Sequence, residues 1–146
     1  MRPVLRMRRE AVICVLVVFI LALGGCASTV KFQQSTITPA ARGIIEVDRD
    51  DNNNIALEIQ VEHLADPSSL SPPATVYVAW AKTTDGSISN LGQLSVDEDL
   101  TGLLTAVTPH KQIQLLVTGE DEAAVDTPSS RVILETKFFD AAKMTK

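Results

Sequence analysis

The chain has 146 residues, 45% of them hydrophobic and only 4% aromatic, and its 18 acidic residues outnumber its 13 basic ones, for a net charge of −5. This acidic composition argues against nucleic-acid binding, which depends on clustered lysine and arginine side chains against the phosphate backbone. The length fits a single domain with a modest hydrophobic core.

The first 25 residues have the composition of a secretory signal peptide. Residues 1–10 carry four arginines and one glutamate, and residues 11–23 are apolar without a charge. Because spanning a bilayer core takes roughly 20 residues, this run is short for a transmembrane helix. We therefore expect a cleaved signal peptide over residues 1–25. The alternative is an uncleaved signal anchor in which the following cysteine has no role.

The apolar run ends in Leu23, Gly24 and Gly25, directly before Cys26. This order resembles the lipobox of bacterial lipoproteins, in which small residues precede the cysteine whose thiol receives a diacylglyceryl group. The resemblance implies cleavage before Cys26 and lipidation of that residue. Two or three acyl chains would then hold the protein to a membrane durably, whereas a single chain anchors only marginally.

Cleavage at this site changes both the cysteine count and the charge of the chain. Cys26 would be the only cysteine left, so the domain would have no disulfide and would depend on its hydrophobic core. Nine basic residues would remain against 17 acidic ones, a net charge of −8. Residue 27 is Ala and not Asp, which by resemblance to lipoprotein sorting in enteric bacteria favours the periplasmic face of the outer membrane. The outer leaflet of the inner membrane is the alternative.

Residues 26–42 are expected to form the lipidated cysteine and a tether. They are rich in Ser, Thr, Gln and Ala and show no sustained hydrophobic period. Val30 and Phe32 alternate with polar neighbours, so a short first strand in this segment is the alternative interpretation.

From Gly43 onward the dominant hydrophobic period is two, which is typical of β-strands. We expect strands at 44–47, 55–61, 76–81, 91–96, 102–108, 113–117 and 132–136, separated by turn-forming residues. This spacing predicts a single antiparallel, immunoglobulin-like β-sandwich of about seven strands over residues 43–139. Residues 140–146 are expected to form a frayed tail or one helical turn. Trp80, on a strand that is apolar on both sides, is expected in the core between the two sheets.

The sequence offers only weak metal-binding candidates. His63 and His110 are far apart and belong to no zinc motif, so we expect packed or half-exposed side chains at both positions. The run 48–54 suggests a calcium loop with Asp48, Asp50, Asn52 and Asn54 as candidate ligands. However, Asn53 and Ile59 stand where an EF-hand-type loop requires glycine and glutamate. A polar hairpin turn is the preferred interpretation.

No catalytic motif is present in the sequence. Ser87 and Ser89 lie in Gly-Ser-Ile-Ser, which differs from the GxSxG nucleophile elbow. There is no glycine-rich loop of the kind that binds phosphate groups. We therefore expect no enzymatic activity and no cofactor.

Five segments occur in a notable order between Thr75 and Leu134. They are VYVAW (76–80), DG (85–86), LGQL (91–94), IQLLVTGE (113–120) and TPSSRVIL (127–134). This order resembles the extracytoplasmic β-domain of anti-sigma-K factors, and the resemblance implies a β-sandwich outside the membrane. Those factors place a cytoplasmic sigma-binding domain and a transmembrane helix before the β-domain. This chain has a lipoprotein-like signal peptide instead, so sigma-factor binding is not implied.

These observations lead to one functional expectation and one alternative. We expect a non-enzymatic envelope lipoprotein, anchored through acyl chains on Cys26, that contacts an envelope protein as an interaction or structural module. Candidates for exposed apolar contact residues are Leu70, Leu103, Leu104 and Phe139. The alternative is a small-ligand or calcium-binding envelope lipoprotein that uses the loop 48–54.

Overall fold

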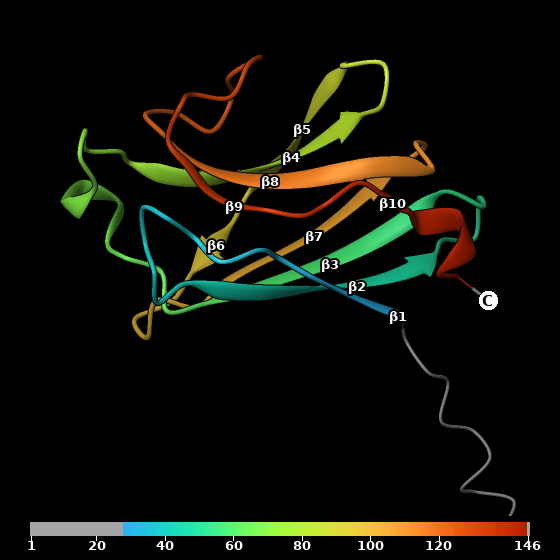
Figure 1. Cartoon of the computed structure of the whole chain (residues 1–146), viewed down its shortest axis with the longest axis horizontal. Coiled ribbons are helices and arrows are strands. Elements are labelled where there is room, and N and C mark those ends of the chain that lie inside the picture. Colours follow the sequence, from blue (N-terminus) through green and yellow to red (C-terminus); the bar gives the residue numbers. More distant parts are fainter. Residues whose placement is uncertain (1–27, 146) are drawn as a thin grey trace, which may run out of the picture.

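The alternating segments form two packed antiparallel sheets in the computed structural model, which describes residues 28–145 (Figure 1). Sheet A contains β1 (Ser28–Lys31), β2 (Arg42–Arg49), β3 (Ile55–Glu62), β7 (Gly102–Thr108) and β6 (Ser95–Val96), in this spatial order. Sheet B contains β10 (Phe139–Asp140), β8 (Gln112–Glu120), β4 (Val76–Thr83) and β5 (Ile88–Gln93), and β9 (Val132–Glu135) also pairs with β8. The predicted all-β sandwich is confirmed.

The rest of the described chain consists of loops and two short 3-10 helices, η2 (Pro67–Ser69) and η3 (Ala141–Lys143). Within residues 28–145, no helix has the length and apolar character needed to cross a membrane. The predicted signal peptide, the lipobox and Cys26 lie outside the described residues.

The core lies between the sheets and follows the alternation of the strands. On β3, Ile55, Leu57, Ile59 and Val61 are buried, while Glu58 on the same strand is exposed. Successive side chains of a strand point to opposite faces of the sheet, so one phase of β3 packs inward and the other faces solvent. Leu115 and Val117 of β8 supply the opposite wall of this core.

Residues 28–31 form a strand, and the tether predicted for them is wrong. β1 pairs antiparallel with β2, with Val30 opposite Ile45. Val30 and Phe32 pack against the core, and the Phe32 amide donates a further hydrogen bond to the carbonyl of Gly43. Two apolar side chains are enough to form a strand here because the edge of β2 supplies the hydrogen-bonding partners. Hydrophobic periodicity along the sequence does not reveal such pairing.

Trp80 is buried, but it does not lie between the two sheets as predicted. Tyr77, Ala79 and Ala81 are the residues of β4 that face the core between the sheets. Trp80 faces the opposite side of sheet B and packs with Val78 and Leu116 in a separate apolar cluster. The prediction was wrong because β4 is apolar in both phases, so its sequence does not indicate which phase faces the other sheet.

The C-terminal segment contains the short helical turn η3, one of the two forms predicted for it, and also the strand β10, which was not predicted. β10 pairs with the start of β8, with Phe139 opposite Ile113 and Asp140 opposite Gln112. Ala141, in η3, is fully buried and its amide donates to the carbonyl of Lys111 at 2.7 Å. The predicted domain limit at residue 139 therefore falls inside a short strand.

Candidate functional site

One loop of the molecule covers the outer face of sheet B. This loop, residues 121–131, is called the strap below. Its Val125 packs against the cluster that contains Trp80. The side-chain amide of Asn90 on β5 donates to the carbonyls of Ala123 and Val125, both at 2.9 Å, and so ties the strap to the sheet. The strap thus buries apolar side chains that would otherwise face solvent.

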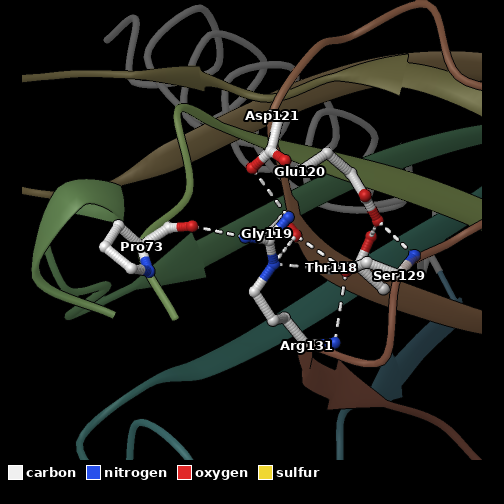
Figure 2. A network of polar contacts seen from close by, with 7 residues as sticks. All are labelled: Pro73, Thr118, Gly119, Glu120, Asp121, Ser129 and Arg131. Carbon is white, nitrogen blue, oxygen red and sulfur yellow. Dashed lines mark hydrogen bonds and ion pairs between the residues drawn. The ribbon is translucent and has the colours of Figure 1, made fainter. Parts of the chain in front are cut away.

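A chain of hydrogen bonds joins Trp80 to the far part of the strap. The Trp80 Nε1–H donates to Thr118 Oγ1 at 2.8 Å, and the Thr118 hydroxyl donates to Glu120 Oε1. The same Glu120 oxygen accepts the backbone N–H of Ser129 at 2.8 Å (Figure 2). Glu120 is only 4% exposed, so these two donors replace the water that a carboxylate otherwise binds.

Arg131, at the end of the strap, connects three segments of the chain. Its Nε donates to the carbonyl of Gly119 at 2.8 Å, and its terminal nitrogens contact the carbonyl of Pro73 and the carboxylate of Asp121 (Figure 2). No buried side-chain nitrogen or oxygen lacks a partner in the described part of the chain. The network consists of groups that satisfy one another, and we interpret it as a structural fastening of the strap.

The outer face of sheet A is open to solvent. Strand register places fourteen side chains on it, and none of them is buried. Two of these side chains are large, apolar and exposed: Leu103 is 47% exposed and Val107 is 51% exposed. Ile44 and Ala56, on neighbouring strands, are half-buried on the same face.

Acidic side chains lie beside these apolar residues. Glu46 and Glu58 stand directly opposite each other on β2 and β3, and Asp48 follows on β2. A shallow hollow of about 170 Å³ lies between these three side chains and Thr105. The ion pairs within residues 28–145 join other residues, so none of these three carboxylates has a cationic partner there. Like charges placed directly opposite on adjacent strands destabilise a sheet, which makes this arrangement unfavourable without a cationic partner.

A second hollow, of about 360 Å³, lies at the other end of the same face. It is bordered by Lys31, Ile44 and Gln60, and by the ion pair between Arg42 and Glu62, whose nitrogen and oxygen are 3.9 Å apart. The outer face of sheet A therefore combines exposed apolar groups, shallow hollows and three carboxylates that have no ion-pair partner within residues 28–145.

The loop 48–54 is a tight polar turn between β2 and β3. Asp50 Oδ1 accepts the backbone N–H groups of Asn52 and Asn54, and Oδ2 accepts the side-chain amide of Asn54 at 3.0 Å. These hydrogen bonds, led by the side chain of Asn54, lower the pKa of Asp50. Asn53 adopts the left-handed conformation with φ of 64°, as asparagine in turns often does.

The turn does not gather the four candidate calcium ligands into one site. Asp50, Asn52 and Asn54 are joined through the Asp50 carboxylate, whereas Asp48 projects from the outer face of sheet A. Across residues 28–145, no group of three or more His, Cys, Asp or Glu side chains is arranged to hold a metal ion.

The remaining candidate residues are dispersed. His63 is exposed, in a left-handed conformation just after β3, and His110 is half-buried. Ser87 and Ser89 lie at the β4–β5 hairpin, where the Ser87 amide donates to the Asp85 carboxylate.

Of the four apolar contact candidates, Leu103 alone is largely exposed. Leu70 is buried, with 7% exposure, and Leu104 and Phe139 are half-buried. Three other exposed apolar residues were missed: Ile37, which is 43% exposed, Val107, and Phe138, which is 46% exposed. On β7 the small residues Gly102, Ala106 and Thr108 point inward together with Leu104, so the bulky residues left over point outward. Only the register of β7 with β3 shows which of its residues face the core and which face solvent.

Comparison with protein-family models gives no match, and comparisons with curated proteins and with solved structures give none either. The functional assignment therefore depends on the residues of this chain and on their arrangement.

Proposed function

We propose that this chain is a non-enzymatic, lipid-anchored envelope lipoprotein whose β-sandwich binds a protein partner through the outer face of sheet A. The observation that carries the proposal is the contrast between the two outer faces. The strap buries the apolar residues of sheet B, whereas Leu103 and Val107 on sheet A are about half exposed. The lipobox-like sequence at Leu23–Cys26 supports the anchor.

The charges on this face define the chemistry of the partner. Glu46, Asp48 and Glu58 have no cationic neighbour in ion-pair distance within the described chain. A partner with lysine or arginine side chains would relieve the repulsion between Glu46 and Glu58, and an apolar side chain on it would cover Leu103 and Val107. Complementary charges of this kind mainly determine register and specificity, while burial of apolar side chains near the centre of an interface contributes most of the affinity.

Site-specific crosslinking in intact cell envelopes tests the proposal. A photo-crosslinking residue at Thr105, in the middle of the outer face of sheet A, is expected to capture a defined protein. The matched control carries the same residue at Glu122, an exposed position on the strap. Mass spectrometry then identifies what each position captures.

Two sets of variants determine whether a captured protein is specific. Leu103→Glu and Val107→Glu are expected to abolish the crosslink from Thr105, because they add charge to an already acidic face. Cys26→Ala is expected to abolish it as well, because the domain would no longer be held at the membrane. A crosslink that persists in the Leu103→Glu variant, or one that is equal from Glu122, contradicts the proposal.

A further inference from the structure

The two ends of the sandwich are defined by the strand register. One end, called the anchor end below, contains the start of β1 and the segments 49–54, 83–87, 108–112 and 137–145. Arg49 at this end donates to Thr145 Oγ1 at 2.6 Å and to the carbonyl of Ala142 at 3.2 Å, which joins sheet A to the C-terminal segment. Figure 1 shows β1 starting close to β10 and the C-terminal turn. The opposite end, called the distal end, contains the segments 62–75, 97–101 and 119–131.

The two ends differ strongly in charge. The anchor-end segments contain equal numbers of cationic and acidic side chains: Arg49, Lys111, Lys137 and Lys143 against Asp50, Asp51, Asp85 and Asp140. The distal end contains two cations, Arg131 and Arg42, the latter at the start of β2 and paired with Glu62. Nine acids lie at this end: Glu62, Asp66, Asp97, Glu98, Asp99, Glu120, Asp121, Glu122 and Asp126. The excess negative charge of the domain is therefore concentrated at the distal end.

The anchor end also carries an exposed aromatic side chain. Phe138 is 46% exposed and follows the exposed Lys137 directly in sequence. It borders a shallow hollow together with Gln112 and Lys143. The side chain of Lys143 is 83% exposed and its ammonium group lies 3.4 Å from the carboxylate of Asp140. An exposed aromatic ring with lysine neighbours is typical of protein surfaces that lie at a membrane–water interface.

The distance from the anchor to this surface is short. If Cys26 is lipidated, as the proposed function requires, only Cys26 and Ala27 precede the first residue of β1. Two residues reach about 7 Å at most when fully extended. The start of β1, and with it the anchor end, must then stay beside the bilayer, while the distal end lies about 26 Å further away, the length of eight strand residues.

We propose that the anchor end is a membrane-contacting surface, in which Phe138 enters the headgroup region and Lys111, Lys137 and Lys143 face anionic lipid headgroups. This inference rests on the lipid anchor of the proposed function and adds a defined orientation to it. The acidic distal end points away from the bilayer, beyond the roughly 8 Å over which charges act at physiological salt. In this orientation the outer face of sheet A is perpendicular to the membrane plane, so a partner can approach it from the side.

Fluorescence quenching with the full lipidated protein in vesicles measures this orientation. The thiol of Cys26 is used by the acyl group, so a dye reacts only with an introduced cysteine. Thr84→Cys places the dye at the anchor end and Ser130→Cys at the distal end, and both positions are exposed. With nitroxide-headgroup lipid in phosphatidylethanolamine–phosphatidylglycerol vesicles, we expect at least fivefold stronger quenching at Thr84. Equal quenching, or stronger quenching at Ser130, overturns the inference.

A longer tether separates surface contact from simple proximity. A flexible insertion of 20 Gly/Ser residues between Ala27 and Ser28 gives a mean reach of about 25 Å, so the anchor alone no longer holds this end down. We expect the Thr84 dye to remain quenched on anionic vesicles and to lose most of its quenching in the Phe138→Ser and Lys143→Glu variants. Ile37→Ser, which removes an apolar residue of similar exposure (43%) from the segment between β1 and β2, is expected to leave the quenching of the Thr84 dye unchanged. If the insertion by itself abolishes the quenching of the Thr84 dye, the proposed membrane contact is overturned.

The failure of this inference is distinguishable from the failure of the proposed function. Intact-mass measurement first shows whether Cys26 carries acyl chains. An unmodified Cys26 removes the anchor and overturns both proposals. An acylated protein whose two dyes are quenched equally overturns only the orientation, and leaves the partner crosslink from Thr105 as a separate result.

Discussion

The two outer faces of this sandwich show two solutions to the same problem. Val78, Trp80 and Leu116 make one phase of sheet B apolar on its outer side, and the chain covers them with the strap. The outer phase of sheet A is mostly polar, as at Glu58 and Gln60 on β3, and no segment within residues 28–145 buries it. A sheet with both phases apolar requires a third layer, whereas a sheet with one polar phase is stable with that face in water.

β7 is the exception on the open face. Its outward phase carries the exposed Leu103 and Val107, although β3 presents mainly polar side chains there, with Gln60 opposite Leu103 and only Ala56, opposite Val107, apolar. On β7, therefore, large apolar side chains are exposed to water at an energetic cost. Binding of a partner over β7 would bury the most apolar surface on this face.

The largest effect is expected from removing the residue that the strap covers. Trp80→Ala deletes a fully buried side chain, so we expect the free energy of unfolding to fall by about 3–5 kcal/mol. Leu103→Ala, on the open face, should change it by less than about 0.5 kcal/mol. Urea denaturation followed by circular dichroism measures both. Similar losses for the two variants would contradict the distinction between a covered and an open face.

The next largest effect concerns the hydrogen bonds beneath the strap. Thr118→Val keeps the shape of a fully buried side chain but leaves the Trp80 Nε1–H and the Glu120 carboxylate without their shared partner. We expect a loss of about 1–3 kcal/mol in unfolding free energy. Thr105→Val is the matched change on the open face and should be close to neutral. Because Trp80 is the only tryptophan, its emission spectrum reports whether the strap stays closed.

A smaller effect is expected in alkaline solution, from the core between the two faces. Burial, assisted by the negative charge of Asp66, raises the pKa of Tyr77 to about 12. Its hydroxyl donates to the carbonyl of Ala65 at 2.8 Å. Since the unfolded phenol ionises near pH 10, the stabilisation is complete below pH 10 and is lost as the pH rises from 10 to 12.

Tyr77→Phe tests this assignment. The variant is expected to be less stable by about 1 kcal/mol at neutral pH and to lose the tyrosine-dependent fall in stability between pH 10 and 12. Tyr77 is the only tyrosine in the chain, so absorbance titration of the wild type follows this phenol alone. A titration midpoint near pH 10 in the folded protein would disagree with its burial.

The smallest effect is expected at the turn that ends the open face. Millimolar calcium should leave the thermal unfolding midpoint of the protein unchanged within about 1 °C, because the Asp50 carboxylate already accepts three hydrogen bonds from its own turn. Isothermal calorimetry gives the matching binding measurement. A clear heat, abolished by Asp50→Asn, would favour the calcium-binding alternative over the interaction module.

The sequence predicted the fold where one phase of a strand is apolar and the other polar. The alternation of β3 is of this kind, and the predicted segment 102–108 coincides with β7. The prediction failed where strand pairing and packing, and not the local hydrophobic pattern, determine the structure. Trp80 was assigned to the wrong face of a doubly apolar strand, and Ser28–Lys31 was assigned to a tether although β2 recruits it.

The candidate binding face was only partly predictable, for the same reason. Leu103 stood out as an apolar residue outside the regular alternation, but Val107 did not. The exposure of both follows from the register that places Ala106 opposite Leu57 and Leu104 opposite Ile59, and register is fixed by pairing across the sheet. The opposition of Glu46 and Glu58 arises in the same way.

The position of β1 has a mechanical consequence. A pull on an anchor at Cys26 would act along the axis of β1, because that strand starts at the anchor end and runs away from it. Such a force shears the four residue pairs between β1 and β2 together instead of opening them one after another, and β2 passes it to β3 over eight further pairs. Tension between the bilayer and a bound partner would thus be transmitted along sheet A, and it would reach sheet B through the segment after β1, where the Gln33 amide donates to the carbonyl of Glu135 on β9.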